Sequence, residues 1–216
     1  PTEVGYVCVP VFFALSGFLI THRTYKAFQQ RQLSFGVYLL RRLVRIYPLY
    51  AAVLTLFVVA LGRPENMMPK GVRAFVAVYT MTQTLFPSLV HIGTTVGWTL
   101  TAEVLFYLIA PTLMRWFGRG KTFGLVVFRA LTISLVAIAL GLLLARLPPL
   151  RLMPDTLIGA PEPFIMHYSL FGHLSDFVVG MVAAFALCRH STLAWLRQHV
   201  HLAIGSGFVG ALVCII

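Results

Sequence analysis

Long apolar runs separated by short polar connectors dominate this chain. An α-helix that crosses the hydrocarbon core of a bilayer needs about 20 consecutive, mostly apolar residues. Runs close to that length cover residues 4–20, 46–61, 98–117, 125–144 and 170–188, and a further run starts at Leu202. The pattern predicts an all-α protein, a polytopic integral membrane helical bundle with about six spans in these residues.

Residues 74–89 form a weaker apolar run, because four polar residues interrupt it, Thr80, Thr82, Gln83 and Thr84. Lys and Arg collect in the short cytoplasmic loops of membrane proteins. By this rule the basic connectors 23–45, 115–129 and 189–197 are cytoplasmic, whereas 87–97 has no Lys or Arg and lies outside. A full crossing by residues 74–89 would reverse these sides. We therefore expect a re-entrant segment, whose Thr and Gln content suits burial in protein or in a wet cavity.

Composition supports the membrane assignment. Hydrophobic residues make up 59% of the 216 residues and charged residues only 11%, whereas a water-soluble domain carries about a quarter charged residues. The net charge is +11, but the basic residues lie in connectors rather than in a stripe, so we expect a lipid bilayer and no nucleic acid as partner. The three cysteines form no C-x-x-C pair and their number is odd, so we expect neither a zinc site nor a disulfide framework.

Two arginines stand at the entrance of the second apolar run, in the sequence RRLVRIYPLY. Arg42 and Arg45 are three residues apart, so on a helix they share one face. Two guanidinium groups on one face could bind phosphates through paired hydrogen bonds. Simple anchoring at the cytoplasmic membrane surface is the alternative, and these residues alone do not decide between the two.

One carboxylate, Glu103, lies within a well-formed apolar run, in the sequence WTLTAEVLFYLIAP. An ionisable residue in a membrane span is costly, and it marks a functional site or a structural ion pair. We interpret Glu103 as a functional residue. Trp98, five residues earlier, is by itself typical of an aromatic anchor at the membrane surface.

Two further places carry polar residues in apolar surroundings. Ser16 and Gly17 lack the G-x-S-x-G context of a nucleophile, so we expect this small pair to allow close helix packing. His173 and Asp176 are one helical turn apart and could form a proton-handling pair. They could equally mark the start of a helix, since Ser175 and Asp176 are good capping residues. No H-x-x-x-H pattern occurs among the histidines, so no metal is expected.

Three of these segments together resemble the acyltransferase-3 family of membrane enzymes, which O-acylate extracytoplasmic sugars and related hydroxyl compounds. FFALSGFLIT is similar to the family's F-F-x-L-S-G-F-L-I-T, RRLVRIYPLY to its R-x-x-R-x-x-P-x-Y, and WTLTAEVLFYLIAP to its W-S/T-L-x-x-E-x-x-F-Y-L-x-x-P. Their order and spacing also fit, and the resemblance extends from about residue 9 to residue 180. Each motif alone is modest evidence, but three in order are strong evidence.

The resemblance implies an enzyme of about ten spans, of which residues 1–216 are a single transmembrane acyltransferase-like domain without its first span and its C-terminal spans. The family's donor is a cytoplasmic acyl-CoA, commonly acetyl-CoA, used as co-substrate with no bound cofactor. Its acceptor is a carbohydrate or another hydroxyl compound outside the bacterial inner (cytoplasmic) membrane. By the family's pattern Arg42 and Arg45 bind the acyl-CoA phosphates, while Glu103 and Trp98 line the reaction cavity as catalytic residues.

Two departures from the family's pattern affect these expectations. The general-base histidine of the family lies in the preceding span and is absent from this chain, so we expect these residues alone to be inactive. The family's R-x-x-E/D-F-x-x-G reads HLSDFVVG here, with His173 in place of arginine. A transporter or flippase for a lipid-linked sugar is the alternative function, although no inverted repeat supports it.

Overall fold

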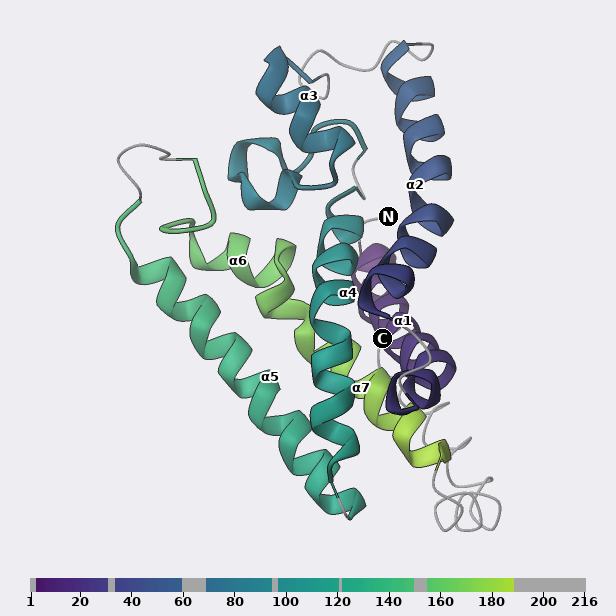
Figure 1. The fold of residues 1–216 in the computed structure, drawn as a ribbon. Coiled ribbons are helices and arrows are strands. Elements are labelled where there is room, and N and C mark those ends of the chain that lie inside the picture. Colours follow the sequence, from purple (N-terminus) through teal and green to yellow (C-terminus); the bar gives the residue numbers. More distant parts are fainter. Residues whose placement is uncertain are drawn as a thin grey trace.

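The computed structural model describes residues 3–30, 34–59, 69–94, 97–120, 122–149 and 155–188, and within these ranges it is helical with no strand. This confirms the predicted all-α class. Figure 1 shows the helices in chain order: α1 (Glu3–Gln29), α2 (Phe35–Val59), α3 (Gly71–Tyr79), the 3₁₀ turns η2 (Gln83–Leu85) and η3 (Pro87–Leu89), α4 (Gly97–Gly118), α5 (Phe123–Arg146), α6 (Glu162–Tyr168) and α7 (Leu170–Cys188).

Three stretches among the described residues are long and apolar enough to cross a membrane. They are α4, α5 and the segment Glu162–Leu187, which joins α6 to α7. The expected number of about six spans is therefore not confirmed, although α1 and α2 are 27 and 25 residues long. The third basic connector, 189–197, and the apolar run from Leu202 lie outside the described residues.

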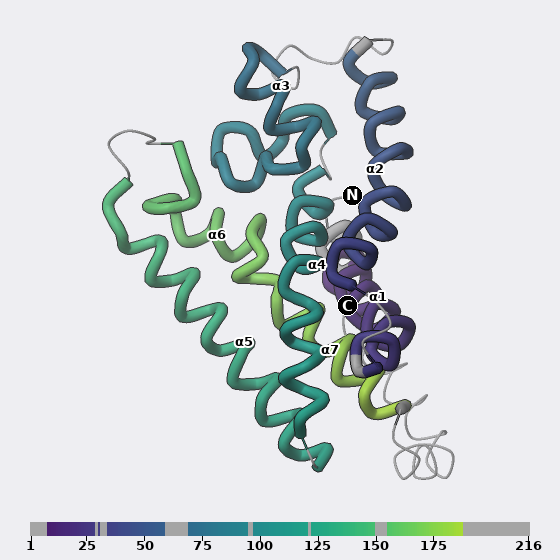
Figure 2. Tube along the Cα trace, viewed as in Figure 1, coloured from purple at the N-terminus to yellow at the C-terminus, as the bar shows by residue number. Residues whose placement is uncertain are grey.

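The most extensive helix contact joins α1 and α7, which cross in Figure 2. Two glycines stand at this crossing. A Cβ atom on Gly17 would overlap the carbonyl oxygen of Phe177, and one on Gly180 would overlap that of Ala14. The two backbones approach so closely that no side chain fits between them, which is the role expected for the small pair in α1.

Helix α4 packs against both crossing helices and carries the largest part of the core. Its Phe106 ring stacks on Phe177 of α7 at a centroid distance of 4.1 Å, and Phe177 stacks in turn on Phe13 of α1 at 4.5 Å. Helix α5 packs against α7, and α2 contacts α4 (Figure 1). The three rings thus tie α1, α4 and α7 into one unit.

Residues 71–89 do not form one spanning helix. Helix α3 has only nine residues, roughly 14 Å at 1.5 Å per residue, and the two short 3₁₀ turns follow it. Its inner side packs on α2, where the Tyr50 hydroxyl donates a hydrogen bond of 2.8 Å to the carbonyl oxygen of Val78. Val78 and Met81 complete a small apolar cluster with Tyr50 and Leu54.

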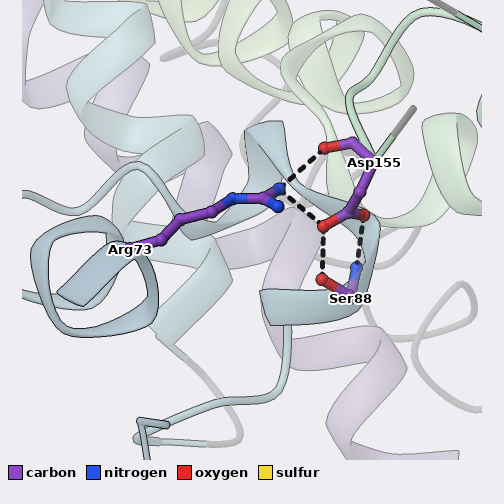
Figure 3. Close-up of polar contacts among 3 residues, drawn as sticks. All are labelled: Arg73, Ser88 and Asp155. Atoms are coloured by element: carbon purple, nitrogen blue, oxygen red, sulfur yellow. Dashed lines mark hydrogen bonds and ion pairs between the residues drawn. The ribbon is translucent and has the colours of Figure 1, made fainter. Parts of the chain in front are cut away.

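Both ends of this segment bind one carboxylate, that of Asp155 in the connector between α5 and α6 (Figure 3). Arg73 donates to the Asp155 carboxylate at 2.6 Å and to its carbonyl oxygen at 3.0 Å. The Ser88 amide donates to the other carboxylate oxygen at 3.0 Å, and the Ser88 hydroxyl donates as well. Because Arg73 and Ser88 bind the same carboxylate, the two ends of the segment lie close together, as a re-entrant segment requires.

The opposite end of the bundle gathers the basic connectors. Arg115 near the end of α4 lies over the Phe28 ring near the end of α1, with 5.8 Å from the guanidinium carbon to the ring centroid. Helix α5 begins there too, after Thr122, whose side chain accepts a hydrogen bond from the amide of Leu125. The cation-rich ends of α1 and α4 therefore lie together, away from Ser88 and Asp155, as the positive-inside rule predicts.

The α1–α7 crossing gives a first prediction. Gly180→Ala should lower the free energy of unfolding by about 1–3 kcal/mol, because the added methyl group overlaps the α1 backbone. Gly124→Ala in α5 is the matched control, since nothing lies within 4 Å of a Cβ there. Thermal unfolding of both variants in detergent would measure the difference. Equal melting temperatures would contradict the close approach.

The Asp155 contacts give a second prediction. Burial alone would raise the pKa of Asp155, but the hydrogen bonds from Ser88 and the nearby Arg73 outweigh it and lower the pKa below its usual 3.8. The ionised form therefore stabilises the fold at neutral pH, and this stabilisation is lost as the pH falls below 3.8.

Asp155→Asn should accordingly speed amide hydrogen exchange in residues 71–89 by about fivefold at neutral pH, a loss of about 1 kcal/mol for a partly exposed ion pair. Glu162→Gln, an exposed carboxylate in α6, serves as the control and should leave these exchange rates unchanged. Unaltered exchange in Asp155→Asn would show that other contacts hold the segment.

Candidate functional site

A cavity of about 980 Å³ lies between α1, α2 and α4, and its walls are mainly apolar. The few polar groups that line it come from all three helices and from the turn before α4. They include Ser16 of α1, Arg42, Arg45 and Tyr50 of α2, and Glu103 and Tyr107 of α4. Clustered polar groups in an otherwise apolar cavity are typical of a binding or catalytic site.

Glu103 is 5% exposed and is held by two hydroxyl groups. The Ser16 hydroxyl donates to its Oε1 at 2.7 Å, and the Tyr107 hydroxyl donates to the same oxygen at 2.6 Å. Tyr107 follows Glu103 by one helical turn and so lies on the same face of α4. Two hydroxyl donors from two helices hold the carboxylate in a fixed position. A carboxylate held in this way can orient a neighbouring group or balance a positive charge at a reacting centre.

Sequence reasoning found Glu103 but missed both of its partners. The i, i+4 spacing was a usable signal for Tyr107. Ser16 lies 87 positions away, and no local pattern indicates such a contact. The sequence predicts close helix packing for the Ser16–Gly17 pair. Gly17 does lie against the α7 backbone, whereas the Ser16 hydroxyl donates to Glu103.

Arg42 and Arg45 line the same cavity as Glu103. Arg42 is half-buried and its guanidinium carbon lies 5.9 Å from the Tyr38 ring centroid, while Arg45 is exposed. The structure therefore brings together the two arginines and the carboxylate on which the sequence analysis focused. Guanidinium groups at one end of an apolar cavity can hold phosphates, because electrostatic attraction is stronger where water is scarce.

Trp98 lies elsewhere and is not among the described residues that line this cavity. Five residues separate it from Glu103, which on a helix is a rotation of roughly 140°. Its ring packs edge-on against Tyr168 at 5.3 Å and lies 5.5 Å from the ring of His173. The expectation that Trp98 and Glu103 line one cavity is therefore not met, because they face different sides of α4.

His173 and Asp176 do form a pair, with 2.9 Å between Nδ1 and Oδ2. The other ring nitrogen, Nε2, lies 3.0 Å from the carbonyl oxygen of His167. A carbonyl oxygen and a carboxylate can both accept hydrogen bonds, so each ring nitrogen of His173 lies beside a possible acceptor. The side chain of His173 is thus engaged on both sides by groups of α6 and α7.

The alternative reading of this pair as a helix start is wrong. Helix α7 begins at Leu170, so Ser175 and Asp176 lie inside it. Asp176 instead connects to the end of α6 through His173, across the break at Ser169. Among the described residues, no group of three or more His, Cys, Asp or Glu side chains could hold a metal ion.

This geometry predicts that His173→Arg retains the fold, whereas His173→Leu lowers the free energy of unfolding by about 1–3 kcal/mol. The leucine would leave the Asp176 carboxylate and the His167 carbonyl without their donor. Thermal unfolding of the three proteins in detergent measures this. A leucine variant as stable as the wild type would show that the pair does not join α6 to α7.

Comparison with known proteins agrees with the motifs. A family model described as an acyltransferase domain matches residues 2–216. No curated protein and no solved structure matches the chain. The match spans nearly the whole sequence, including the three segments that supply Ser16, Arg42, Arg45 and Glu103 to the cavity. The chain belongs to the acyltransferase-3 family.

Proposed function

We propose that the protein is a membrane O-acyltransferase that moves an acyl group from a cytoplasmic acyl-CoA to a hydroxyl of an extracytoplasmic saccharide or related acceptor. The observation that supports this most is that Arg42, Arg45 and Glu103 line one cavity. The arginines belong to the end of α2 that follows the basic connector. The other end of the cavity reaches Thr94 and Gly97, at the start of α4.

In the proposed reaction the acceptor oxygen attacks the thioester carbonyl carbon and loses its proton to a base. The carbon–sulfur bond then breaks, and the CoA thiolate leaves and takes up a proton, so that the products are an ester and free CoA. Holding both substrates in one cavity supplies the proximity that they lack in separate compartments. The donor that the family resemblance implies is acetyl-CoA, and the enzyme would act in the bacterial inner membrane.

In this proposal Arg42, Arg45 and Glu103 would bind and orient the reacting groups, and a separate base would remove the proton from the acceptor hydroxyl. Arg42 and Arg45 would hold the phosphates of CoA through charge-assisted hydrogen bonds. Glu103, fixed by Ser16 and Tyr107, would orient or charge-balance the base. We expect that base to be a histidine, as in the family's pattern, and activity is therefore tested in the full-length protein.

Glu103→Gln in the full-length protein should reduce acyl transfer by at least about 100-fold, because the amide cannot balance the charge of a protonated base. Membrane insertion and thermal stability should stay close to those of the wild type. The exposed Glu162→Gln is the matched control. Wild-type transfer rates in Glu103→Gln would show that the Glu103 carboxylate has no role in the reaction.

Arg45→Ala should raise the KM for acyl-CoA by about tenfold, the loss expected for one hydrogen bond between charged groups. Arg41→Ala is the matched control, since Arg41 is an exposed neighbour on α2 outside the set of cavity-lining residues. An unchanged KM in Arg45→Ala would show that the arginines only anchor α2 at the membrane surface.

A flippase for a lipid-linked sugar is the alternative function. Movement of the sugar across the membrane without consumption of acyl-CoA would favour it.

A further inference from the structure

The side-chain amide of Gln83, in the 3₁₀ turn η2, is buried without a hydrogen-bond partner. Gln83 is 0% exposed, and neither its Nε2 nor its Oε1 bonds to another described residue. A buried amide that forms no hydrogen bonds is costly, so native proteins rarely keep one unless water or a ligand completes it. Gln83 is also one of the polar residues that interrupt the apolar run 74–89. Neither phosphate binding nor orientation of the base gives it a role.

The Gln83 amide lies directly beside the outer end of the cavity, the end that Thr94 and Gly97 line. A Cβ atom on Gly97 would be 2.5 Å from the Gln83 Nε2 and 2.7 Å from the Thr94 hydroxyl oxygen. Because Gly97 has no side chain, the amide approaches its backbone closely. The amide and the Thr94 hydroxyl therefore border the same small space, next to two residues of the cavity wall.

A second polar atom without a partner lies on the same side of α4. The Thr101 side chain is 1% exposed, and its hydroxyl bonds to no other described residue. Thr101 follows Gly97 by one helical turn, so it lies on the face of α4 where Gly97 meets Gln83. One amide and one hydroxyl thus remain unsatisfied where η2 packs on α4.

The chemistry of these groups is that of a site for hydroxyl compounds. A glutamine amide offers two donors and an acceptor oxygen, and a threonine hydroxyl can donate or accept. Neighbouring hydroxyl groups of a saccharide both donate and accept, so they can satisfy this set of groups. An anion would find no guanidinium or ammonium group in it. The acceptor, which comes from outside the membrane, would also reach this end of the cavity first, because the arginines lie at the other end.

We propose that Gln83 and Thr94 bind a hydroxyl group of the acceptor saccharide that neighbours the hydroxyl to be acylated. This inference rests on the proposed acyltransferase function and assigns its acceptor subsite. The reaction is unchanged: the acceptor oxygen takes the acyl carbon, and the CoA thiolate leaves and is protonated. The acceptor would reach the covered amide by displacing η2 from Gly97. Because η2 has only three residues, it can move without breaking a long helix.

Gln83→Met in the full-length protein tests the subsite, because methionine is similar in length and lacks the amide. Acetyl transfer from acetyl-CoA is measured in nanodiscs with the methyl pyranosides of glucose, galactose, mannose and rhamnose as acceptors. We expect the KM for the best acceptor to rise by at least about tenfold, the effect of one or two neutral hydrogen bonds. The KM for acetyl-CoA should stay unchanged, since the arginines hold the donor.

A structural role for Gln83 would give a different result. Removal of an unpartnered buried amide should leave the melting temperature equal to that of the wild type or about 2 °C higher. Thr21→Val is the matched control. The Thr21 hydroxyl is also without a partner among the described residues, its side chain is 1% exposed, and Thr21 does not line the cavity. This variant should retain the melting temperature and both KM values.

Amide hydrogen exchange in residues 71–94 measures acceptor binding without turnover. A saturating methyl pyranoside should slow this exchange in the wild type and leave it unchanged in Gln83→Met, because only the wild type has the amide that the sugar would bind.

The outcomes separate the two proposals. An unchanged acceptor KM in Gln83→Met would overturn the acceptor subsite, and continued acetyl transfer would leave the acyltransferase function standing. A melting temperature below that of Thr21→Val, or an equal rise in both KM values, would show a structural role and would also overturn the subsite. Slower exchange in the wild type without any transfer would support the subsite and overturn the proposed reaction. Neither transfer nor altered exchange with any of the four sugars would overturn both.

Discussion

The approach of α1 to α7 at Gly17 and Gly180 is the constraint on which the other contacts of α1 depend. At this crossing each glycine faces the backbone of the other helix, so α1 has one possible depth and rotation against α7. That rotation directs Ser16 to the carboxylate of Glu103 and Phe13 to the rings of Phe177 and His173. A side chain at either glycine would push the helices apart and withdraw both contacts.

Helix α4 divides the bundle into two polar sites with different chemistry. On the side of α1 and α2, Glu103 faces an open apolar cavity that also contains two arginines, so its carboxylate can meet a ligand. On the side of α6 and α7, His173 lies between Asp176 and the His167 carbonyl, and its ring nitrogens are both engaged. The first arrangement suits binding and reaction, whereas the second joins two helices where the chain breaks.

The segment 71–89 supports one wall of the cavity, although it supplies none of the arginines or carboxylates that line it. Asp155 fixes both of its ends, and Tyr50 and Val78 fix its inner side against α2. Tyr50 also lines the cavity. The connector between α5 and α6, distant in the sequence, therefore supports one wall of the cavity through a hydrogen-bonded carboxylate and a short helix.

The sequence by itself determined the helical class, the basic ends of the helices, the arginine pair and Glu103, because apolar periodicity and isolated charges are local signals. Loop charge also predicts a re-entrant segment at residues 74–89, where the structure has a nine-residue helix and two short 3₁₀ turns. Only the tertiary structure decided the partners: Ser16 for Glu103, Asp155 for Arg73 and Ser88, and separate faces of α4 for Trp98 and Glu103. These contacts join residues far apart in the chain, and they depend on how helices rotate and cross, which no local spacing encodes.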